Sequence, residues 1–412
     1  MSEDMGGWGI YLEFANHTVA SGNTIAASNP QKGISCGAVY NTTLTENRLI
    51  GCGIRFYQLA TNILQNNTID DKPVVHVDGV SNQVIEDAEQ VFLFNCSNIT
   101  VKNIYPSANY TNTIHLEETK FSEVTSCRGN IVLTNSDNNT IHDNFPKSIK
   151  LTGSNYNRIA ANAIVDSGVC IMLYGSSNYN DVYENVLLNS STSPDADALF
   201  ASGRNTVGIK LGDPLLGGCQ HNNIYRNILI NHIVGIECVI SSNNSIHENY
   251  MADSNVGISL SGSYHNRVYQ NNITNCLTAV GIRGSHNSFY NNNFLDNSNQ
   301  VSIRHTYLFS TDIITEYSVN NTFSLGLPLG GNYWSDYNGT DSNGDGVGDT
   351  PYIINEDTQD NHPLMEPVEA PVLEIPETIP EFPSWTHILL LSAASAFTIA
   401  VFKRKLNTKQ IP

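Results

Sequence analysis

A glycine-rich acidic loop near the C-terminus carries the oxygen ligands of a hard-cation site. The stretch "NGTDSNGDGVGDTPY" places carboxylate and amide side chains at alternate positions, with Gly346 where the chain must turn sharply. The candidate ligands are the side chains of Asp341, Asn343, Asp345 and Asp349 and the backbone carbonyl of Val347. Ca²⁺ prefers such a set of oxygen atoms. The sequence therefore predicts a structural Ca²⁺ site in this loop.

This loop resembles the calcium loops of EF-hands, dockerins and thrombospondin repeats, with one departure. The twelfth position, where a bidentate Glu completes a standard loop, is Tyr352. Closure of the site would need Asp336, Asp357 or Asp360. The alternative interpretation is an acidic turn that is simply solvated.

Acidic residues that could act in catalysis gather in residues 189–220, an interruption of the chain's repeats. The candidate catalytic residues are Asp195, Asp197 and Asp213, with Arg204 and Lys210 near them. A glycosidase needs two carboxylates about 5–10 Å apart, which sequence cannot show for different turns. "HLEETKF" (115–121) is a second candidate stretch. Because the "GHG", "RIK" and "YG-x-DPH" motifs of polysaccharide-active enzymes are missing, we expect no catalysis, and a polysaccharide hydrolase, lyase or epimerase is the alternative.

Aromatic residues recur at one repeat position and could bind sugars. Tyr183, Tyr225, Tyr269 and Tyr290 each follow an aliphatic residue expected to point inward, so strand alternation predicts that the rings point outward. His247 fills the same position. An exposed ring offers a sugar both apolar area and a polar tip. Aromatic neighbours also stabilise stacked strands, so a purely structural role stays open.

Histidines share a second repeat position and raise the question of copper. The members of this column are Tyr156, Tyr179, His221, Asn243, His265 and His286. Imidazoles on adjacent turns could bind a metal. No Cys or Met accompanies them, so we expect a ladder at a surface corner.

These candidate residues must be positioned by a repeat. "HNNIYRNIL", "NNSIHENYM", "HNRVYQNNI" and "HNSFYNNNF" repeat with a period of about 22 residues, seen at Asn222, Asn244, Asn266 and Asn287. Asparagine makes up roughly an eighth of the chain, well above average usage. Several short β-prone runs per period predict a right-handed parallel β-helix over residues 1–325, with inward aliphatics stacked in one core. We expect Asn at the corners, because it tolerates the left-handed conformation and its amide can bond to the next turn.

Net charge, cysteines and glycosylation sequons limit the classes of partner and the cellular location that we expect. The net charge is −19, from 39 acidic and 20 basic residues, which argues against a nucleic acid as partner. Of the eight cysteines, Cys170, Cys238 and Cys276 lie in apolar runs, so we expect buried free thiols. Sequons such as those at Asn16, Asn66, Asn109, Asn189, Asn272 and Asn338 make glycosylation plausible outside the cell.

The C-terminal region predicts an anchor. A cap at 326–366 precedes a Pro- and Glu-rich linker at 367–383. Residues 384–402 are apolar and long enough to span a membrane as a helix, and the basic tail at 403–412 places the rest of the chain outside. The N-terminus begins inside a repeat-like "GWGIYL" without a signal peptide, so we expect the true start to lie upstream.

Two resemblances extend this interpretation. The repeats, together with "IDDKPVVHV", "EDAEQVFLFNCSNITVKNI" and "GGNYWSDYNGTDSNGDGVGDTPYII", resemble archaeal NosD-like β-helix proteins, with Asp71 and Glu89 where the family usually has Gly. "PEFPSW", the apolar span and the basic cluster resemble PEF-CTERM signals, which implies cleavage by an archaeosortase-type enzyme and lipid attachment. We therefore expect a cell-surface β-helix that binds a polysaccharide or envelope glycan. A NosD-like copper accessory protein is a further alternative.

Overall fold

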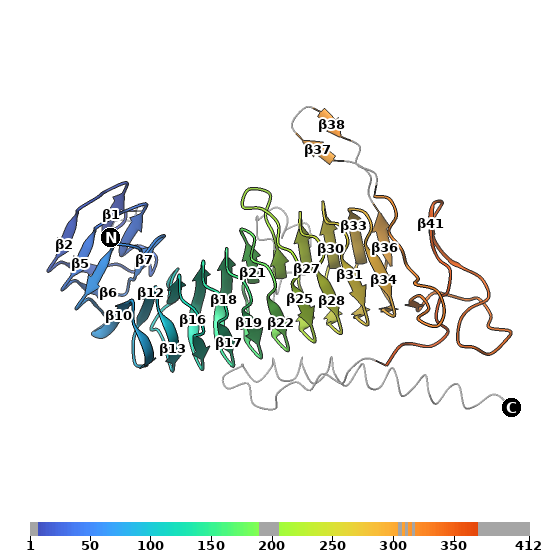
Figure 1. Ribbon diagram of the computed structural model, residues 1–412, viewed down its shortest axis with the longest axis horizontal. Helices are drawn as coiled ribbons and strands as arrows, with labels where there is room; N and C mark the ends of the chain where they lie inside the picture. The colour runs from blue at the N-terminus through green and yellow to red at the C-terminus, as the bar shows by residue number, and fades with distance from the viewer. Residues whose placement is uncertain (1–6, 189–205, 304–306, 310–311, 315–317, 370–412) are drawn as a thin grey trace. The chain divides into compact units, whose positions relative to one another are not determined.

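Short strands joined at tight corners make up the chain wherever the structure describes it. The computed structural model describes residues 7–188, 206–303, 307–309, 312–314 and 318–369, and this part is all strand and loop, without a helix. Met1–Pro371 form one compact unit and Val372–Pro412 a second, which lies outside the described residues. Figure 1 shows the strands of the first unit stacked turn upon turn. The predicted parallel β-helix is confirmed.

Three long sheets form the walls of the stack. The fourteen-stranded sheet is, in order, β3 (Thr24–Ala26), β6 (Arg48–Ile50), β9 (Thr68–Ile69), β10 (Lys72–Asp78), β12 (Gln90–Phe94), β14 (Ile114–Glu117), β16 (Arg128–Thr134), β18 (Phe145–Thr152), β21 (Val169–Tyr174), β24 (Val207–Leu211), β27 (Val234–Val239), β30 (Val256–Ser261), β33 (Thr278–Arg283) and β36 (Val301–Ile303). The ten-stranded sheet is β11 (Ser81–Ile85), β13 (Ser97–Lys102), β15 (Glu123–Thr125), β17 (Thr140–His142), β19 (Arg158–Ala160), β22 (Asp181–Tyr183), β25 (Asn223–Tyr225), β28 (Ser245–His247), β31 (Arg267–Tyr269) and β34 (Ser288–Tyr290). The seven-stranded sheet is β20 (Ala163–Val165), β23 (Val186–Leu188), β26 (Ile228–Ile230), β29 (Tyr250–Ala252), β32 (Asn272–Thr274), β35 (Asn293–Leu295) and β39 (Tyr333–Trp334).

Smaller sheets complete the described strands. They are β1 (Ile10–Glu13), β4 (Ile34–Gly37) and β7 (Ile54–Phe56); β2 (Val19–Ser21), β5 (Thr43–Thr45) and β8 (Ile63–Gln65); the hairpin of β37 (Tyr307–Phe309) and β38 (Asp312–Ile314); and the hairpin of β40 (Tyr352–Asn355) and β41 (Thr358–Asp360). Because β35 pairs with β39, the stack continues beyond residue 325, into the segment predicted as the cap.

The inward aliphatic column lies where the repeat predicts it. Ile224, Ile246, Val268 and Phe289 pair in register on consecutive turns and are fully buried. Turns are shorter further upstream, with 17 residues between Ser122 and Asn139. As predicted, the cysteines are free thiols, and all eight are buried. Burial raises the pKa of Cys170 to about 12, which keeps the thiol protonated and inert.

Two columns of asparagine amides run inside the corners of the stack. One begins after Ser122 and comprises Asn139, Asn157, Asn180, Asn222, Asn244, Asn266, Asn287 and Asn321; the other comprises Asn144, Asn162, Asn185, Asn227, Asn249, Asn271, Asn292 and Asn332. The backbone N and Nδ2 of Asn227 both donate to Oδ1 of Asn249, at 3.0 Å. Each rung thus satisfies buried polar groups of two turns.

Both expectations for Asn are confirmed, but on different residues: the buried amides bond from turn to turn, whereas the left-handed conformation falls on corner residues such as Asn138, Asn243 and Asn291. Positive φ falls on the residue before every amide of the two columns except Asn332, as in His221 at 57°, Asn243 at 59° and His265 at 57°. Asn recurs at these inward corners because the position needs a side chain with both a hydrogen-bond donor and an acceptor, which the Asn amide supplies. The left-handed corner position itself accepts several residue types, including rings.

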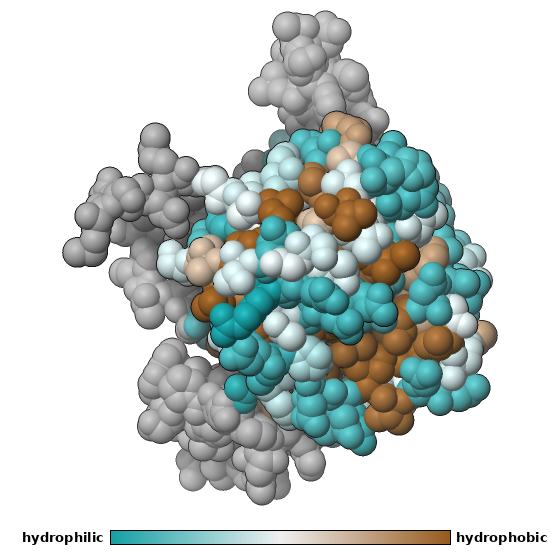
Figure 2. All heavy atoms as spheres, turned by 90° about the vertical axis from the view of Figure 1, so that its left-hand side faces the viewer, coloured by the Kyte–Doolittle hydropathy of each residue, from teal (hydrophilic) through white to brown (hydrophobic). Residues whose placement is uncertain are grey.

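The first three turns form a stack with its own core. Strands β1 to β9 enclose a hydrophobic cluster that is separate from the main one and includes Leu44, Leu49 and Ile54. At the junction β9 pairs antiparallel with β10, whereas the neighbouring pair of β6 and β9 is parallel. The outer end of this stack exposes apolar side chains, among them Phe14 and Val19, and brown areas lie between polar ones in this view (Figure 2).

Buried polar side chains join this N-terminal stack to the main one. The amide of Gln90 accepts from the backbone N of Ile54 at 2.8 Å and donates to its carbonyl at 2.9 Å. The side chain of Gln90 thus satisfies the backbone polar groups of Ile54 at the edge of β7, as a neighbouring strand would. Glu117 accepts from the backbone N of Leu59 at 2.6 Å. Glu89, which replaces the usual Gly, is fully buried and accepts from the hydroxyl of Tyr110 at 3.0 Å.

An aromatic plug closes the other end of the main stack. Trp334 stacks on Phe294 at 4.4 Å and on Tyr352 at 4.2 Å between ring centroids. Beneath it, Asp360 is fully buried and accepts from the indole N of Trp334 at 2.9 Å and from the backbone N of Asn332 at 2.7 Å. Burial raises the pKa of Asp360, and these hydrogen bonds oppose the rise.

Several predictions concern residues outside the described part of the chain. These include most of the linker at 367–383, the span at 384–402 and the basic tail at 403–412. Among the described residues, no helix is long and apolar enough to cross a membrane.

Candidate functional site

The outer face of the ten-stranded sheet carries most of the predicted binding residues, and we call it the ladder face. Two side chains of each short strand point outward here, which gives two parallel columns along the stack. The predicted rings occupy one column, in register through the pairs Tyr183 with Tyr225, His247 with Tyr225 and Tyr269, and Tyr269 with Tyr290. The predicted outward direction is confirmed by their alternation with fully buried neighbours.

These rings lie face to face on one another. Centroid distances are 4.9 Å for Tyr183–Tyr225, 5.2 Å for Tyr225–His247, 4.6 Å for His247–Tyr269 and 5.1 Å for Tyr269–Tyr290, with interplanar angles of 8° or less. Burial raises the pKa of Tyr225, Tyr269 and Tyr290. The faces that a sugar would need are therefore largely covered by neighbouring rings. At the end of the column, Ala160 stands next to Tyr183, so one face of Tyr183 has no ring upon it.

The histidine column is the predicted corner ladder. Tyr156 stacks on Tyr179 at 5.1 Å, Tyr179 on His221 at 4.9 Å and His265 on His286 at 5.0 Å. All of these residues have positive φ and lie at a surface corner. Stacked imidazoles do not converge on a common point, as metal ligands must.

Phe121 occupies the same corner as these rings but stands apart from them. Its φ is 54°, its side chain is 64% exposed, and within the described residues no aromatic ring stacks upon it. A bulky apolar residue is rare in this backbone conformation and gains little there from burial. The ring is therefore exposed and is not covered by another ring, which leaves it available to a ligand. The aligned corner column contained the signal, since Phe121 is an apolar ring where other turns carry Asn, Tyr or His.

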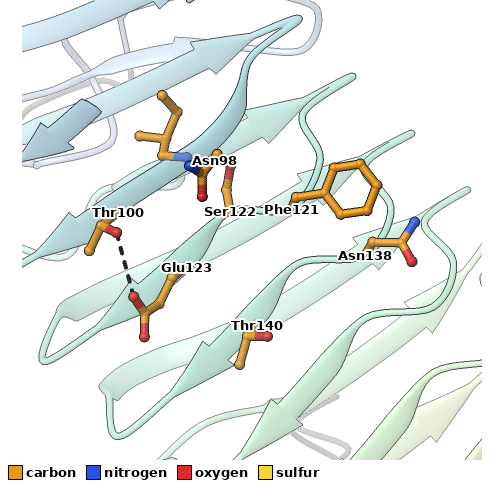
Figure 3. Close-up of a pocket in the computed structure, with 8 residues that line it drawn as sticks. Asn98, Thr100, Phe121, Ser122, Glu123, Asn138 and Thr140 are labelled. Atoms are coloured by element: carbon orange, nitrogen blue, oxygen red, sulfur yellow. Dashed lines mark hydrogen bonds between the residues drawn. The ribbon is translucent and has the colours of Figure 1, made fainter. Parts of the chain in front are cut away.

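Two hollows adjoin Phe121. One, of about 410 Å³, lies on the ladder face and is lined by Asn98, Glu123, Asn138 and Thr140 among others (Figure 3). The second, of about 510 Å³, lies on the other side of the ring and is lined by residues including Ser97, Lys120 and Asn135. Both hollows are open to solvent, so a ligand here would lie along the surface.

Glu123 is held in a fixed orientation at the floor of the first hollow. One carboxylate oxygen lies 2.6 Å from Nε2 of His142, and the other accepts from the hydroxyl of Thr100 at 3.5 Å. Nδ1 of His142 lies 2.7 Å from the carboxylate of Asp143. Burial lowers the pKa of His142, but the hydrogen bonds to Asp143 and Glu123 outweigh burial, and the net pKa is raised. This arrangement favours an ion pair between imidazolium and carboxylate.

None of the other predicted catalytic acids that the structure describes lies in this region. Asp195, Asp197 and Arg204 lie outside the described residues. Asp213 is in a tight turn, where its side chain accepts from the backbone N of Leu215 at 2.9 Å, and Lys210 is 3.2 Å from Glu237. In "HLEETKF", Glu117 is buried at the N-terminal joint, whereas Lys120 and Phe121 border the hollows.

The predicted calcium loop is folded upon its own backbone. Asp341 accepts from the backbone N of Gly344 and Gly346 at 2.7 and 2.9 Å, and Asp345 accepts from that of Val347 at 2.9 Å. Asp349 accepts from the hydroxyl of Ser342 at 2.7 Å. Asn343 donates to Asp345 at 3.0 Å. Asp360, one of the three residues offered as a closing ligand, is instead buried in the plug, and Asp336 and Asp357 stay the candidates.

Comparison with models of known protein families identifies the family of this chain. The model of the family described as "Periplasmic copper-binding protein (NosD)" matches residues 76–199 and 201–339, more than half of the sequence. The chain belongs to the NosD family. The predicted NosD-like resemblance is thereby confirmed, while an archaeal origin and a PEF-CTERM anchor stay predictions.

The copper named in the NosD description does not fit the described residues. No three side chains among His, Cys, Asp and Glu come together as a metal site in the described part of the chain. The cysteines are separately buried, and Cys219 donates to the carbonyl of Leu173 at 3.1 Å. Neutral thiols of this kind, and histidines stacked in a column, are not arranged to bind Cu⁺ or Cu²⁺.

Solved structures similar to this NosD-family chain have low sequence identity. The periplasmic alginate epimerase AlgG is 12% identical, over 74% of this chain and 77% of that one, with a TM-score of 0.33. The Dettilon tailspike protein is 16% identical, over 72% and 61%, with a TM-score of 0.38. A GH87 α-1,3-glucanase from Streptomyces thermodiastaticus strain HF3-3 is 13% identical, over 77% and 64%, with a TM-score of 0.36. A comparison with curated proteins finds no match.

Proposed function

We propose that this NosD-family chain is a glycan-binding protein of the cell surface that carries out no catalysis. The observation that carries the proposal is the pair of hollows beside Phe121, where an exposed ring is bordered by amide and hydroxyl groups. Sugars are bound by this combination, because their C–H faces stack on rings while their hydroxyls need donors and acceptors.

The location follows from the family and from the tail. NosD proteins are described as periplasmic, and the predicted apolar span with its basic tail supports anchoring at the outer side of the membrane. In this proposal the C-terminus is the substrate of an archaeosortase-type enzyme, and the β-helix projects toward an envelope glycan.

Binding and turnover are separated by one experiment. The full chain is applied to an oligosaccharide array, and the reducing ends and unsaturated products released from each bound glycan are measured. We expect binding without product. Release of product that is abolished by Asp195→Asn or Asp197→Asn would establish a hydrolase or lyase instead, and absence of binding to any glycan would reject the proposal.

We further propose that Ca²⁺ binds the loop of Asp341, Asn343, Asp345, Val347 and Asp349 and stabilises the C-terminal cap. The hydrogen bonds within the loop are compatible with this, because a carboxylate oxygen can accept a hydrogen bond and also bind a cation. Chelation should lower the melting temperature of the protein, with a stability loss of about 2.7 kcal/mol where free Ca²⁺ was 100-fold above its dissociation constant. Asp345→Ala should remove this sensitivity. Equal melting curves with and without chelator would mean that the loop is a solvated acidic turn that binds no Ca²⁺.

A further inference from the structure

The two hollows beside Phe121 are parts of one surface feature. The first draws residues from three successive turns, at 98–100, 121–123 and 138–140. The second draws residues from the same three turns, at 95–97, 118–121 and 135. Phe121 is the residue that both hollows share, so its ring forms the ridge between them.

The order of these residues fixes the direction of the feature. In each turn, the residues of the second hollow come immediately before those of the first along the chain. Neighbours along the chain follow the circumference of a β-helix, whereas neighbours on different turns follow its axis. The hollows therefore lie side by side around the corner, across the axis of the stack. The columns of stacked rings run along that axis.

The electrostatic character of the hollows favours an uncharged ligand. His142 lies 2.6 Å from Glu123 and 2.7 Å from Asp143, so its single positive charge is shared by two carboxylates, and the remaining negative charge disfavours an anionic ligand. The second hollow contains one acid, Glu118, and one base, Lys120. The remaining polar lining is amide and hydroxyl, as in Asn138. A polyanionic glycan would also be repelled by the net charge of −19.

We propose that a neutral linear oligosaccharide lies across the stack here, with one sugar residue in each hollow and the ring of Phe121 between them. In this site Phe121 is the stacking platform. Glu123, oriented by His142, accepts hydrogen bonds from sugar hydroxyls in the first hollow, and charge-assisted bonds of this kind are the stronger ones. This inference rests on the proposed glycan-binding function and gives it a place, a direction and a class of ligand.

The test compares variants of the full chain on an array of neutral hexose, uronic-acid and glucosamine oligosaccharides. We expect neutral oligomers to bind and the affinity to rise from one sugar residue to two. Phe121→Ala should weaken binding at least about fivefold, since stacking on an aromatic ring contributes on the order of 1–3 kcal/mol. Phe121→Tyr should retain binding because the ring remains. Glu123→Gln should weaken binding about tenfold through loss of a charge-assisted acceptor.

Tyr156→Ala is the matched control, because Tyr156 has the same corner position, a φ of 58° and 56% exposure, but is stacked on Tyr179. Its neutral-glycan affinity should not change. If neutral glycans bind equally well to the wild type and Phe121→Ala, the glycan-binding function stands and the site proposed here is wrong. Preference for uronic-acid or glucosamine oligomers overturns the assignment to neutral sugars. Binding to no glycan rejects both proposals.

Discussion

The ladder face contains two stretches that use aromatic side chains in opposite ways. From β22 to β34 each ring covers the faces of its neighbours, and the column contributes to the stability of the stack. At the β15 turn, Phe121 is 64% exposed and covers nothing. The same turn lacks the regular interior amides, with Ser122 and Cys127 at the positions that Asn occupies in later turns.

The difference shows where a repeat protein has room for a ligand. Where the repeat is regular, side chains of adjacent turns satisfy one another, inside through amides and outside through rings. Where the repeat is irregular, ring faces and polar groups are left over for another molecule. A count of exposed aromatic residues would have favoured the wrong stretch, because half-buried rings in a stack present mainly their edges.

The largest expected effect comes from breaking the regular stretch from within. Asn249→Ala removes an amide that donates to the carbonyl of Ile224 at 2.9 Å and to Oδ1 of Asn271 at 3.0 Å. Each buried group left without a partner costs about 1–3 kcal/mol, so we expect a loss of about 4 kcal/mol. Urea denaturation measures it. Asn299→Ala, at an exposed asparagine, is the control and should have no effect. A loss below about 1 kcal/mol would mean that the amide column adds little.

A smaller loss is expected when a ring is removed from the outside of the same stretch. Tyr225→Ala deletes two stacked contacts, with Tyr183 and His247. Aromatic pairs contribute about 0.5–1.5 kcal/mol each beyond burial, so the free energy of unfolding should fall by about 2 kcal/mol. Glycan affinity should stay at the wild-type value. A variant of normal stability with weakened glycan binding would show that the stacked rings, and not Phe121, form the binding surface.

A third variant makes the irregular turn resemble the regular ones. The thiol of Cys127 lies 3.8 Å from the carbonyl of Val101, in the place where Nδ2 of Asn144 reaches the carbonyl of Val124 at 2.9 Å. Cys127→Asn should add one rung to the amide column and raise stability by about 1 kcal/mol. Thermal and urea unfolding would both detect this gain. Destabilisation would show that the turn is too distorted to accept the interior pattern of its neighbours.

The smallest expected effect is at Phe121 itself. Asn tolerates the left-handed conformation better than Phe, so Phe121→Asn should raise stability by roughly 0.5 kcal/mol while glycan binding is lost. Such an opposition between stability and binding is common at functional positions. The measurement is a pair of melting curves and binding isotherms. A loss of more than about 1 kcal/mol would identify Phe121 as a structural residue.

Much of the regular stretch could be predicted from the sequence because its chemistry repeats. The period of Asn222, Asn244 and Asn266 gave the turn length, and strand alternation gave the direction of Tyr225 and Tyr269. The alternation of inward and outward residues does not predict whether the rings of successive turns stack on one another. That contact depends on side-chain torsions, and it decides whether a ring face is free.

The irregular parts could be predicted less well for a physical reason. The contact of Gln90 with Ile54 joins segments 36 residues apart through a single side chain, and no periodic signal marks such a contact. Asp360 is equally isolated: it was one of three acids that could have closed the calcium loop, and nothing in the sequence marks its hydrogen bond to the indole of Trp334. Phe121 was included in a candidate stretch, but its isolation from other rings became visible only in three dimensions.

The buried position of Asp360 has an electrical consequence for the whole amide column. From Asn144 to Asn292 the backbone N–H and one N–H of Nδ2 donate to the side-chain oxygen of the next turn, while the other N–H of Nδ2 donates back to a backbone carbonyl of the preceding turn. Every side-chain oxygen of the column therefore faces the N-terminal end. The column is thus a row of aligned dipoles with its positive pole at Asn332, comparable to the amino end of an α-helix. The carboxylate of Asp360 stands at that pole and accepts from the backbone N of Asn332 at 2.7 Å and from its Nδ2 at 3.3 Å. The negative charge of Asp360 neutralises the positive end of the column. The carboxylate also takes the place that the amide oxygen of a further Asn would hold, so the column ends at Asn332.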